Sequence, residues 1–360
     1  MNHTVQKMLI SALLLGSGTC MADADMRQVI DTRVAPLMQQ QGIPGLSIAV
    51  VNKGKAQYFN YGVANKDTQQ PVTEDTLFEI GSVSKTFTAT LGGYAQATGK
   101  LKLSDKASQH LPALAGSAFD QISLLQLATY TPGGLPLQFP DAADSAENML
   151  GYFQHWQPTY APGAQRLYSN PSIGLFGYLS AQSLGQPYNV AMEKTLLPKL
   201  GLSNTHVSVP ADKSGQYAQG YDKLQKPVRV GPGALDSEAY GIKTSAQDLA
   251  HYVMLNMHPQ TLEKPLQQAI AATHAGYYTV NGMTQGLGWE RYPYPIKLNA
   301  LLDGNSTPMA MEPHKVNWLT PAQPQPANVL YNKTGSTGGF GAYVVYVPSK
   351  DMGVVILANK

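Results

Sequence analysis

Three apolar stretches near the end of the chain decide the fold: ANVLYNK (residues 327–333), AYVVYV (342–347) and MGVVILA (352–358). Each is short and rich in β-branched and aromatic residues, which is typical of strands, and PSKD (348–351) is a turn sequence between the last two. GLSIAVVN (45–52), near the other end, has the same character. We therefore expect strands from both ends of the chain.

The rest of the chain supports a mixed fold. A further strand is expected at 55–63, joined to 45–52 by the hairpin signal Lys53-Gly54, and helical patterns occupy the stretches 26–40, 82–96, 122–129 and 173–184. We predict an α+β fold in which an antiparallel sheet from N- and C-terminal segments is flanked by helices and carries an inserted, mostly helical domain. The predicted boundaries are 25–78 and 225–360 for the sheet domain, and 79–224 for the inserted domain with its Ω-loop. Residues 292–326, rich in Pro and Asn, are expected to form long loops.

The first residues resemble an export signal. Lys7 precedes a short apolar run, MLISALLL (8–15), and small residues follow, with cleavage expected after Ala22 or Ala24. We predict that residues 1–22 form a signal peptide, whose removal would take away Cys20, the single cysteine. No other apolar stretch approaches the roughly 18–20 residues of a membrane span, so no membrane association is expected.

Composition excludes several classes of function. The chain has 360 residues, with 25 Lys and Arg against 23 Asp and Glu, and no basic run, so nucleic acid is not expected as a partner. One cysteine excludes internal disulfides and zinc ribbons. The histidines are scattered without metal-ligand spacing, and no metal or cofactor is expected. No G-x-S-x-G elbow occurs.

Ser82-Val83-Ser84-Lys85 matches S-x-x-K, a signature of penicillin-recognising serine enzymes. Residues i and i+3 share a helix face, so the Lys85 amine can reach the Ser82 hydroxyl. A helix start also offers N–H groups to an oxyanion. Roughly one such match is expected by chance in a chain of this length, and Lys85 would then be a surface lysine.

Two further patterns occur in the same order as in those enzymes. Tyr168-Ser169-Asn170 is a Y-x-N pattern, and a tyrosine beside two lysines would have a lowered pKa and could act as a base; the alternative is a half-buried core tyrosine. Lys333-Thr334-Gly335 is a K-T-G pattern at the end of a predicted strand, where Lys and hydroxyl groups can hold a carboxylate. Tyr58-Phe59-Asn60 and Lys213-Ser214-Gly215 are weaker competing matches.

Taken together, these blocks resemble the class C β-lactamases, or cephalosporinases. The resemblance covers residues 25–360 and rests on the blocks FEIGSVSKTF (78–87), GLPLQ (134–138), YSN (168–170), YAQGY (217–221), DSEAYG (236–241) and KTGSTGGFGAY (333–343). Ser169 stands where Ala is commoner in the family. The resemblance implies a monomeric periplasmic serine hydrolase that acts on small β-lactam substrates.

The resemblance also implies roles for individual residues. Ser82 would be the nucleophile, Lys85 and Tyr168 would exchange its proton, and which of the two is the base stays open. The N–H groups of Ser82 and Ser336 would form the oxyanion hole. Lys333 would be the fourth catalytic residue. The predicted substrate-binding residues are Gln138, Asn170, Thr334, Gly335, Ser336, Tyr221 and Glu290.

Two rivals and one departure remain. A D-Ala-D-Ala peptidase or esterase of the same fold would share S-x-x-K and Y-x-N, and a non-catalytic penicillin-binding sensor would be acylated without turnover. Family members continue past the equivalent of Leu357–Lys360 into a C-terminal helix that helps to bind the substrate carboxylate. If Lys360 is the true end, we expect one sheet face to be less covered and part of that carboxylate site to be missing.

Overall fold

The computed structural model describes residues 23–360, and the side chains from Met26 onward. The predicted signal peptide therefore lies outside the described residues. In the described part of the chain, no helix combines the length and the apolar character that a membrane crossing needs.

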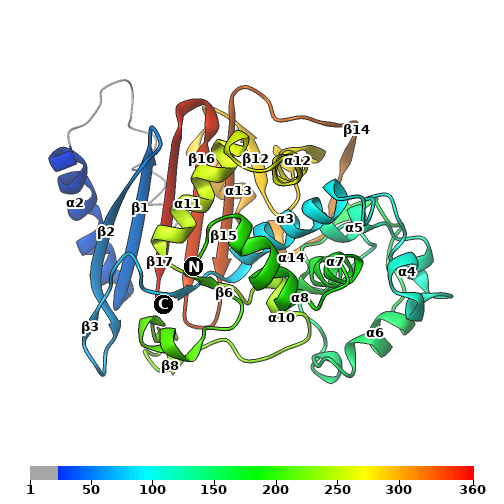
Figure 1. The fold of residues 1–360 in the computed structure, drawn as a ribbon, viewed down its shortest axis with the longest axis horizontal. Helices are drawn as coiled ribbons and strands as arrows, with labels where there is room; N and C mark the ends of the chain where they lie inside the picture. The colour runs from blue at the N-terminus through cyan, green and yellow to red at the C-terminus, as the bar shows by residue number, and fades with distance from the viewer. Residues whose placement is uncertain (1–22) are drawn as a thin grey trace.

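The central feature is a ten-stranded sheet in which every neighbouring pair is antiparallel (Figure 1). Across the sheet, the strands are β14 (Asn317–Gln323), β10 (Gly276–Val280), β11 (Met283–Gln285), β12 (Glu290–Pro293), β15 (Val329–Ser336), β16 (Gly341–Val347), β17 (Met352–Ala358), β1 (Gly45–Asn52), β2 (Lys55–Asn65) and β3 (Gln70–Pro71). The predicted α+β fold, with strands from both ends in one sheet, is confirmed.

The two ends of the chain meet where β1 pairs with β17. Leu46 lies opposite Ala358 and Asn52 lies opposite Met352. The hairpin between β1 and β2 turns at Lys53 and Gly54, both with positive φ, which is the backbone twist that a two-residue hairpin favours. The local turn signal and the long-range pairing therefore agree.

Both faces of the central strands are buried, because successive side chains point to opposite faces. Ile48, Val354 and Ile356 belong to the core that includes Val34 and Leu37 of α2. Ala49, Val51, Val355 and Leu357 belong to the core that includes residues of α11 and α3. This arrangement explains the nearly continuous apolar runs of β1 and β17.

The helices are α2 (Asp23–Gln41), α3 (Ser84–Ala97), α4 (Ala107–His110), α5 (Leu124–Ala128), α6 (Met149–His155), α7 (Asn170–Ser183), α8 (Tyr188–Val190), α9 (Leu197–Lys199), α10 (Asp236–Ala239), α11 (Ala246–Met257), α12 (Lys264–His274), α13 (Leu298–Gly304) and α14 (Thr307–Met311). Helix α3 is central and packs against α7, α10 and α12, whereas α4, α5 and α6 lie at the end of the molecule away from β1 and β2 (Figure 1). The boundaries of the two predicted domains remain a prediction.

The prediction of long loops over 292–326 is wrong. This region contains the end of β12, helices α13 and α14, and strand β14. Its prolines stand where they are compatible with regular structure: Pro308 lies in the first turn of α14, and Pro321 lies in an outermost strand of the sheet. Strands β10 and β11 were not predicted either.

Candidate active site

Ser82 lies at the start of the central helix α3. A 3₁₀ turn, Gly81–Val83, leads directly into α3, so that Lys85 stands one turn after Ser82. The Lys85 ammonium group donates to Ser82 Oγ at 2.8 Å and to the carbonyl oxygen of Ala239 at 2.8 Å. The i, i+3 contact expected from S-x-x-K is therefore present.

Lys85 is fully buried, which changes its acidity. Desolvation is the largest effect and lowers the pKa of Lys85 to about 8, with the charge of Lys333 acting in the same direction and Tyr168 opposing it. A lysine with this pKa can exist in either protonation state near neutral pH. It can therefore give up or take a proton more readily than a surface lysine.

Tyr168 lies immediately before α7, whose N-cap is Ser169, with the Ser169 hydroxyl accepting from Ser172 N. The ammonium nitrogens of Lys85 and Lys333 each lie 5.1 Å from the centroid of the Tyr168 ring. Burial alone would raise the pKa of Tyr168, but the charges of Lys333 and Lys85 outweigh burial and lower it to about 8. The pKa values of both groups, Lys85 and Tyr168, are thus lowered toward neutral pH.

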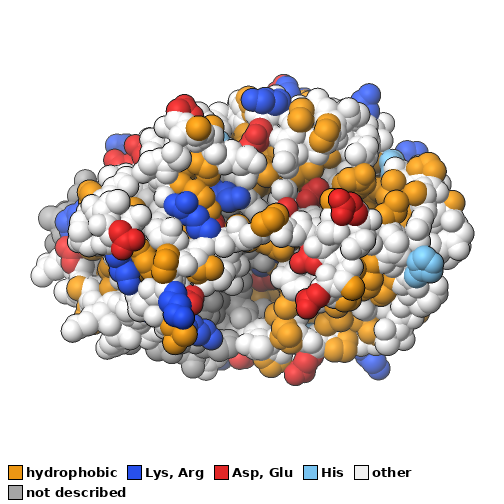
Figure 2. Space-filling model, turned by 90° about the horizontal axis from the view of Figure 1, so that it is seen from below, with side chains coloured by type: hydrophobic (Ala, Val, Ile, Leu, Met, Phe, Trp, Pro, Cys, Tyr) orange, Lys and Arg blue, Asp and Glu red, His pale blue; other side chains and the backbone are white. Residues whose placement is uncertain are grey.

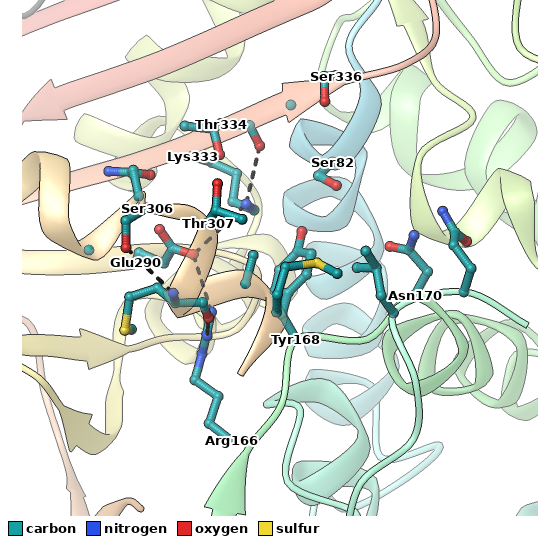
Figure 3. A pocket seen from close by; sticks show the side chains of 18 residues that line it. Ser82, Arg166, Tyr168, Asn170, Glu290, Ser306, Thr307, Lys333, Thr334 and Ser336 are labelled. Atoms are coloured by element: carbon teal, nitrogen blue, oxygen red, sulfur yellow. Dashed lines mark hydrogen bonds and ion pairs between the residues drawn. The ribbon is translucent and has the colours of Figure 1, made fainter. Parts of the chain in front are cut away.

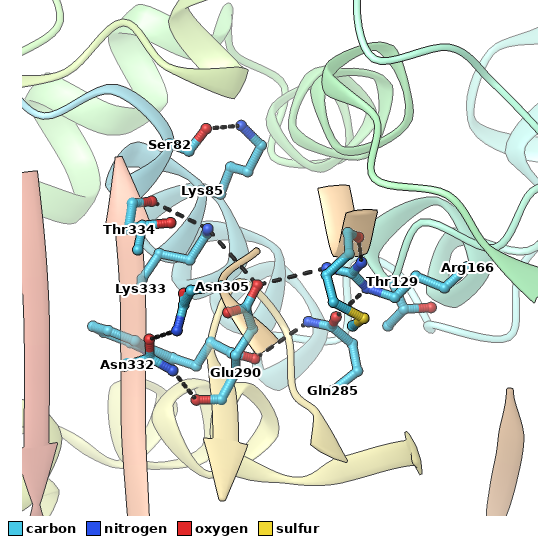
Figure 4. A network of polar contacts seen from close by, with 12 residues as sticks. Ser82, Lys85, Thr129, Arg166, Gln285, Glu290, Asn305, Asn332, Lys333 and Thr334 are labelled. Atoms are coloured by element: carbon cyan, nitrogen blue, oxygen red, sulfur yellow. Dashed lines mark hydrogen bonds and ion pairs between the residues drawn. The ribbon is translucent and has the colours of Figure 1, made fainter. Parts of the chain in front are cut away.

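A buried ion-pair network lies beneath these groups (Figure 4). Glu290 Oε1 is 3.6 Å from Arg166 Nη2 and 3.9 Å from Lys333 Nζ. Arg166 also donates to Gln285 and, at 2.6 Å, to the carbonyl oxygen of Met309. One carboxylate therefore faces two cations close to Tyr168.

The strand that carries K-T-G packs tightly on the segment that carries Ser82. A Cβ added at Gly335 would lie 2.0 Å from Ile80 O and 3.0 Å from Ser82 N. A Cβ added at Gly81 would lie 2.4 Å from Ser336 N. The backbone amides of Ser82 and Ser336 are consequently close neighbours, which is the arrangement an oxyanion hole needs.

These groups surround a cavity of about 410 Å³, within the usual range for small-molecule sites (Figure 3). Its lining includes nine of the predicted site residues: Ser82, Gln138, Tyr168, Asn170, Glu290, Lys333, Thr334, Gly335 and Ser336. Lys85 is not part of the cavity lining, but its ammonium group contacts Ser82 Oγ. Asn170 Oδ1 is buried and has no hydrogen-bond partner among the described residues.

Tyr221 is not brought into this cavity. Its hydroxyl accepts from Lys66 N at 2.8 Å, and its ring lies under the Lys66 ammonium group at 4.4 Å. Tyr221 is buried in strand β7 (Gly220–Tyr221), so it has no access to a ligand beside Ser82. The later family-like block, DSEAYG (236–241), contains another tyrosine, Tyr240. This residue directly follows Ala239, whose carbonyl oxygen accepts from Lys85.

Glu290 lines the cavity, but its carboxylate is engaged with Arg166 and Lys333. Arg166 and a wall formed by residues of Gly304–Met311 also line the cavity, and neither was predicted from the sequence. The only available signal for Arg166 was its spacing of two residues from Tyr168, which places both on one side of an extended chain. The wall was missed because its region was expected to be loop.

The described residues 23–360 contain no group of three or more His, Cys, Asp and Glu side chains that could hold a metal ion. On the face seen in Figure 2, acidic and basic side chains are interspersed with apolar and uncharged ones.

Comparison with known proteins identifies the family. The family model described as Beta-lactamase matches residues 30–360. A curated beta-lactamase from Pseudomonas fluorescens is 74% identical over 336 residues, which cover 93% of this chain and 94% of that protein. This chain belongs to the beta-lactamase family. A beta-lactamase from Escherichia coli (strain K12) is 43% identical and covers 98% of this chain, with 94% of its own length matched.

Solved structures identify the class of this beta-lactamase. A class C beta-lactamase in complex with cefoxitin has a TM-score of 0.90 and 48% identity, with 94% of each chain covered. A beta-lactamase/D-alanine carboxypeptidase from Pseudomonas syringae has a TM-score of 0.91 and 47% identity, again covering 94% of each chain. The predicted class is confirmed: the chain is a serine beta-lactamase of class C.

Proposed function

We propose that this class C beta-lactamase opens the β-lactam ring of cephalosporins and penicillins through an acyl-enzyme on Ser82. The observation that carries the proposal is the contact of 2.8 Å between Ser82 Oγ and the buried Lys85 amine at the edge of the cavity. Cefoxitin, the ligand of the related class C enzyme, supports cephalosporins as the substrate class.

The first half-reaction needs a proton acceptor for Ser82. As Oγ forms a bond to the β-lactam carbonyl carbon, its proton passes to Lys85 or Tyr168, whose pKa values are both lowered to about 8. The C–N bond of the ring then breaks, and the proton is delivered to the ring nitrogen. The oxyanion formed during attack would accept from Ser82 N and Ser336 N.

In the second half-reaction, water replaces the ring nitrogen. The same pair of groups takes a proton from the water, the water oxygen bonds to the ester carbon, and the proton returns to Ser82 Oγ as the ester bond breaks. In this mechanism, both half-reactions use only Ser82, Lys85, Tyr168, the two backbone amides and water.

Polar groups around the cavity would orient the substrate. Lys333 and Thr334 would attract the substrate carboxylate, with the Lys333 charge shared between that carboxylate and Glu290. Asn170, with its buried and unpartnered Oδ1, and Gln138, which is exposed on the rim, would hold the side-chain amide.

Nitrocefin hydrolysis by the purified mature protein tests this proposal. We expect many turnovers per enzyme molecule, and a transient mass increase on the peptide that contains Ser82. Ser82→Ala should lose both. Full hydrolysis by Ser82→Ala would overturn the assignment of the nucleophile.

A D-alanine carboxypeptidase activity is the second candidate, favoured by the similarity to the beta-lactamase/D-alanine carboxypeptidase from Pseudomonas syringae. Release of D-alanine from a D-Ala-D-Ala peptide, measured beside nitrocefin turnover, compares the two activities. A stable acyl adduct with no nitrocefin turnover would favour the peptidase or a penicillin-binding sensor.

We also propose that residues 1–22 direct export to the periplasm and that the mature protein is a monomer. Mass spectrometry of the protein recovered from a periplasmic extract should give an N-terminus at residue 23 or 25. Light scattering of that protein should give the mass of one chain, and a mass of two chains would contradict the monomer.

A further inference from the structure

Glu79 is a fully buried carboxylate three residues before Ser82, a position outside the cavity lining. It ends the short strand β4 (Phe78–Glu79), in which it pairs with Lys243 of strand β9 (Lys243–Thr244). A buried carboxylate is costly unless its oxygens are hydrogen-bonded. The bonds of Glu79 therefore show which parts of the molecule it holds.

The two oxygens of Glu79 hold different segments. Oε1 accepts from the Tyr217 hydroxyl at 2.5 Å and from Val230 N at 3.0 Å. Oε2 accepts from the Thr337 hydroxyl at 2.5 Å. The first oxygen thus holds the segment around 217–230, and the second holds the turn that follows β15.

The contact with Thr337 connects residues that are near in sequence to Ser82 and Ser336, whose amides would form the oxyanion hole. Thr337 follows Ser336, and its own N–H donates to Phe340 O at 3.0 Å, which closes the turn. On the other side, Glu79 lies two residues before Gly81, where an added Cβ would lie 2.4 Å from Ser336 N. A single carboxylate–hydroxyl contact therefore joins the two segments that carry the amides of Ser82 and Ser336.

We propose that Glu79 is a positioning residue for the oxyanion hole and that it acts through Thr337. This inference rests on the proposed acyl-enzyme at Ser82. The half-buried Thr337 hydroxyl sets the position of the exposed Ser336 backbone, and Glu79 anchors that hydroxyl to the nucleophile segment. A displacement of about 1 Å at a reacting centre can cost about 100-fold in rate.

The two oxygens of Glu79 provide a matched pair of variants. Thr337→Val removes the hydroxyl that reaches Oε2 and keeps the side-chain shape. Tyr217→Phe removes a hydroxyl that reaches Oε1 and keeps the ring, which contacts Arg229 at 3.9 Å and Phe340 at 6.4 Å between centroids. Both variants leave a buried carboxylate with one donor fewer, but Tyr217→Phe keeps Val230 N on Oε1, whereas Thr337→Val removes the donor to Oε2. The carbonyl band of the acyl-enzyme, rather than the loss of stability, therefore separates a positioning role from a structural one.

We expect Thr337→Val to lower kcat for nitrocefin about 10- to 100-fold with little change in KM, because the amides act mainly on the transition state. The infrared C=O band of its acyl-enzyme should move to higher wavenumber, since the carbonyl accepts weaker hydrogen bonds. Thr337→Ser should restore both values. Tyr217→Phe should lower the melting temperature but keep kcat and the band position.

Several outcomes would overturn the inference. One is wild-type kcat and band position in Thr337→Val, and another is an equal loss of kcat in Tyr217→Phe. If Thr337→Val does not fold, Thr337→Ala measured in the same way decides, and a wild-type band position again overturns the inference. If the wild-type enzyme forms no adduct on Ser82, the proposed function fails first and this inference fails with it.

Discussion

At Tyr168, burial and charge act in opposite directions on one phenol. Desolvation favours the neutral form, while the ammonium groups of Lys85 and Lys333, 5.1 Å from the ring centroid, favour the tyrosinate. The charges prevail and lower the pKa to about 8. A tyrosine in this setting can hold or release a proton near neutral pH, which ordinary tyrosine cannot.

Tyr168→Phe should therefore lower kcat for nitrocefin by about 10²- to 10⁴-fold, the usual contribution of general acid–base catalysis. Tyr130→Phe is the matched control, because the Tyr130 ring lies 4.7 Å from that of Tyr168 and is also buried, but Tyr130 is not part of the cavity lining. Steady-state kinetics of both variants make the comparison. A small effect of Tyr168→Phe would assign the base role to Lys85.

Lys333→Met should move the acidic limb of the kcat/KM profile to higher pH. The positive charge of Lys333 lowers the pKa values of both Tyr168 and Lys85, so its removal raises both, and the base needs a higher pH to lose its proton. The shift is expected whichever group is the base.

Profiles measured from about pH 5 to 10 give the shift, because this range includes the lowered pKa values of about 8 for Lys85 and Tyr168 and extends to the ordinary value of a tyrosine. Lys66→Met is the control, since Lys66 lies over Tyr221 outside the cavity. An unchanged limb in Lys333→Met would show that the charge of Lys333 does not tune the base.

At the scale of elements, the site depends on strand β15 lying directly against the turn that carries Ser82. Glycine at position 335 permits this approach, because a Cβ there would lie 2.0 Å from Ile80 O. Gly338, three residues later, has no neighbour closer than 3.6 Å to the equivalent position. The same substitution should therefore have different consequences at the two sites.

Gly335→Ala should destabilise the protein by about 1–3 kcal/mol, as overpacking does, and should also lower kcat because β15 must move away from Ser82. Gly338→Ala should be close to wild type in both respects. Urea denaturation and nitrocefin kinetics measure the two effects. Equal behaviour of the two variants would contradict the close packing of β15.

Helices α13 and α14 show how an element can be hidden from sequence reasoning. Proline and asparagine suggest loops, yet Ser306 caps α14 through Met309 N, and Asn305 Nδ2 donates to Asn332 Oδ1 at 2.9 Å. The second contact joins α13 to β15. These helices are stabilised by their neighbours rather than by their own composition, as is common for short helices.

At the scale of the whole molecule, Asn359 joins parts of the chain that are far apart in sequence. Its Oδ1 accepts from Gly45 N at 2.7 Å, and its Nδ2 donates to Val63 O at 3.1 Å and Gln219 O at 3.0 Å. Asn359 is fully buried, so no water replaces these partners when the side chain is truncated without rearrangement.

Asn359→Ala should reduce the free energy of unfolding by at least about 1–3 kcal/mol, the cost of one unpaired buried polar group. The kcat of the folded variant should remain near that of the wild type, because the side chain is outside the cavity lining. Urea denaturation followed by circular dichroism gives the first quantity. Asn317→Ala, at an exposed position of β14, should have little effect.

The sequence by itself determined the fold class, several of the central strands and the residues Ser82, Lys85, Tyr168 and Lys333 as candidates. These conclusions depend on local information: short, nearly continuous apolar runs, a turn pair at Lys53-Gly54, and i, i+3 spacing on a helix. Such patterns can be recognised in the sequence because the residues that form them are close to one another along the chain.

Only the tertiary structure decided the electrostatic and geometric setting of those residues. Arg166, Glu290 and the wall at Gly304–Met311 reach the site from three separate parts of the chain, and Thr337 meets Glu79 across 258 positions. A pKa depends on charges within a few ångströms and on burial, and neither is encoded in residue spacing. Residue spacing also does not show which neighbours a side chain meets: Tyr221, predicted from the block YAQGY (217–221), lies against Lys66 instead of beside Ser82.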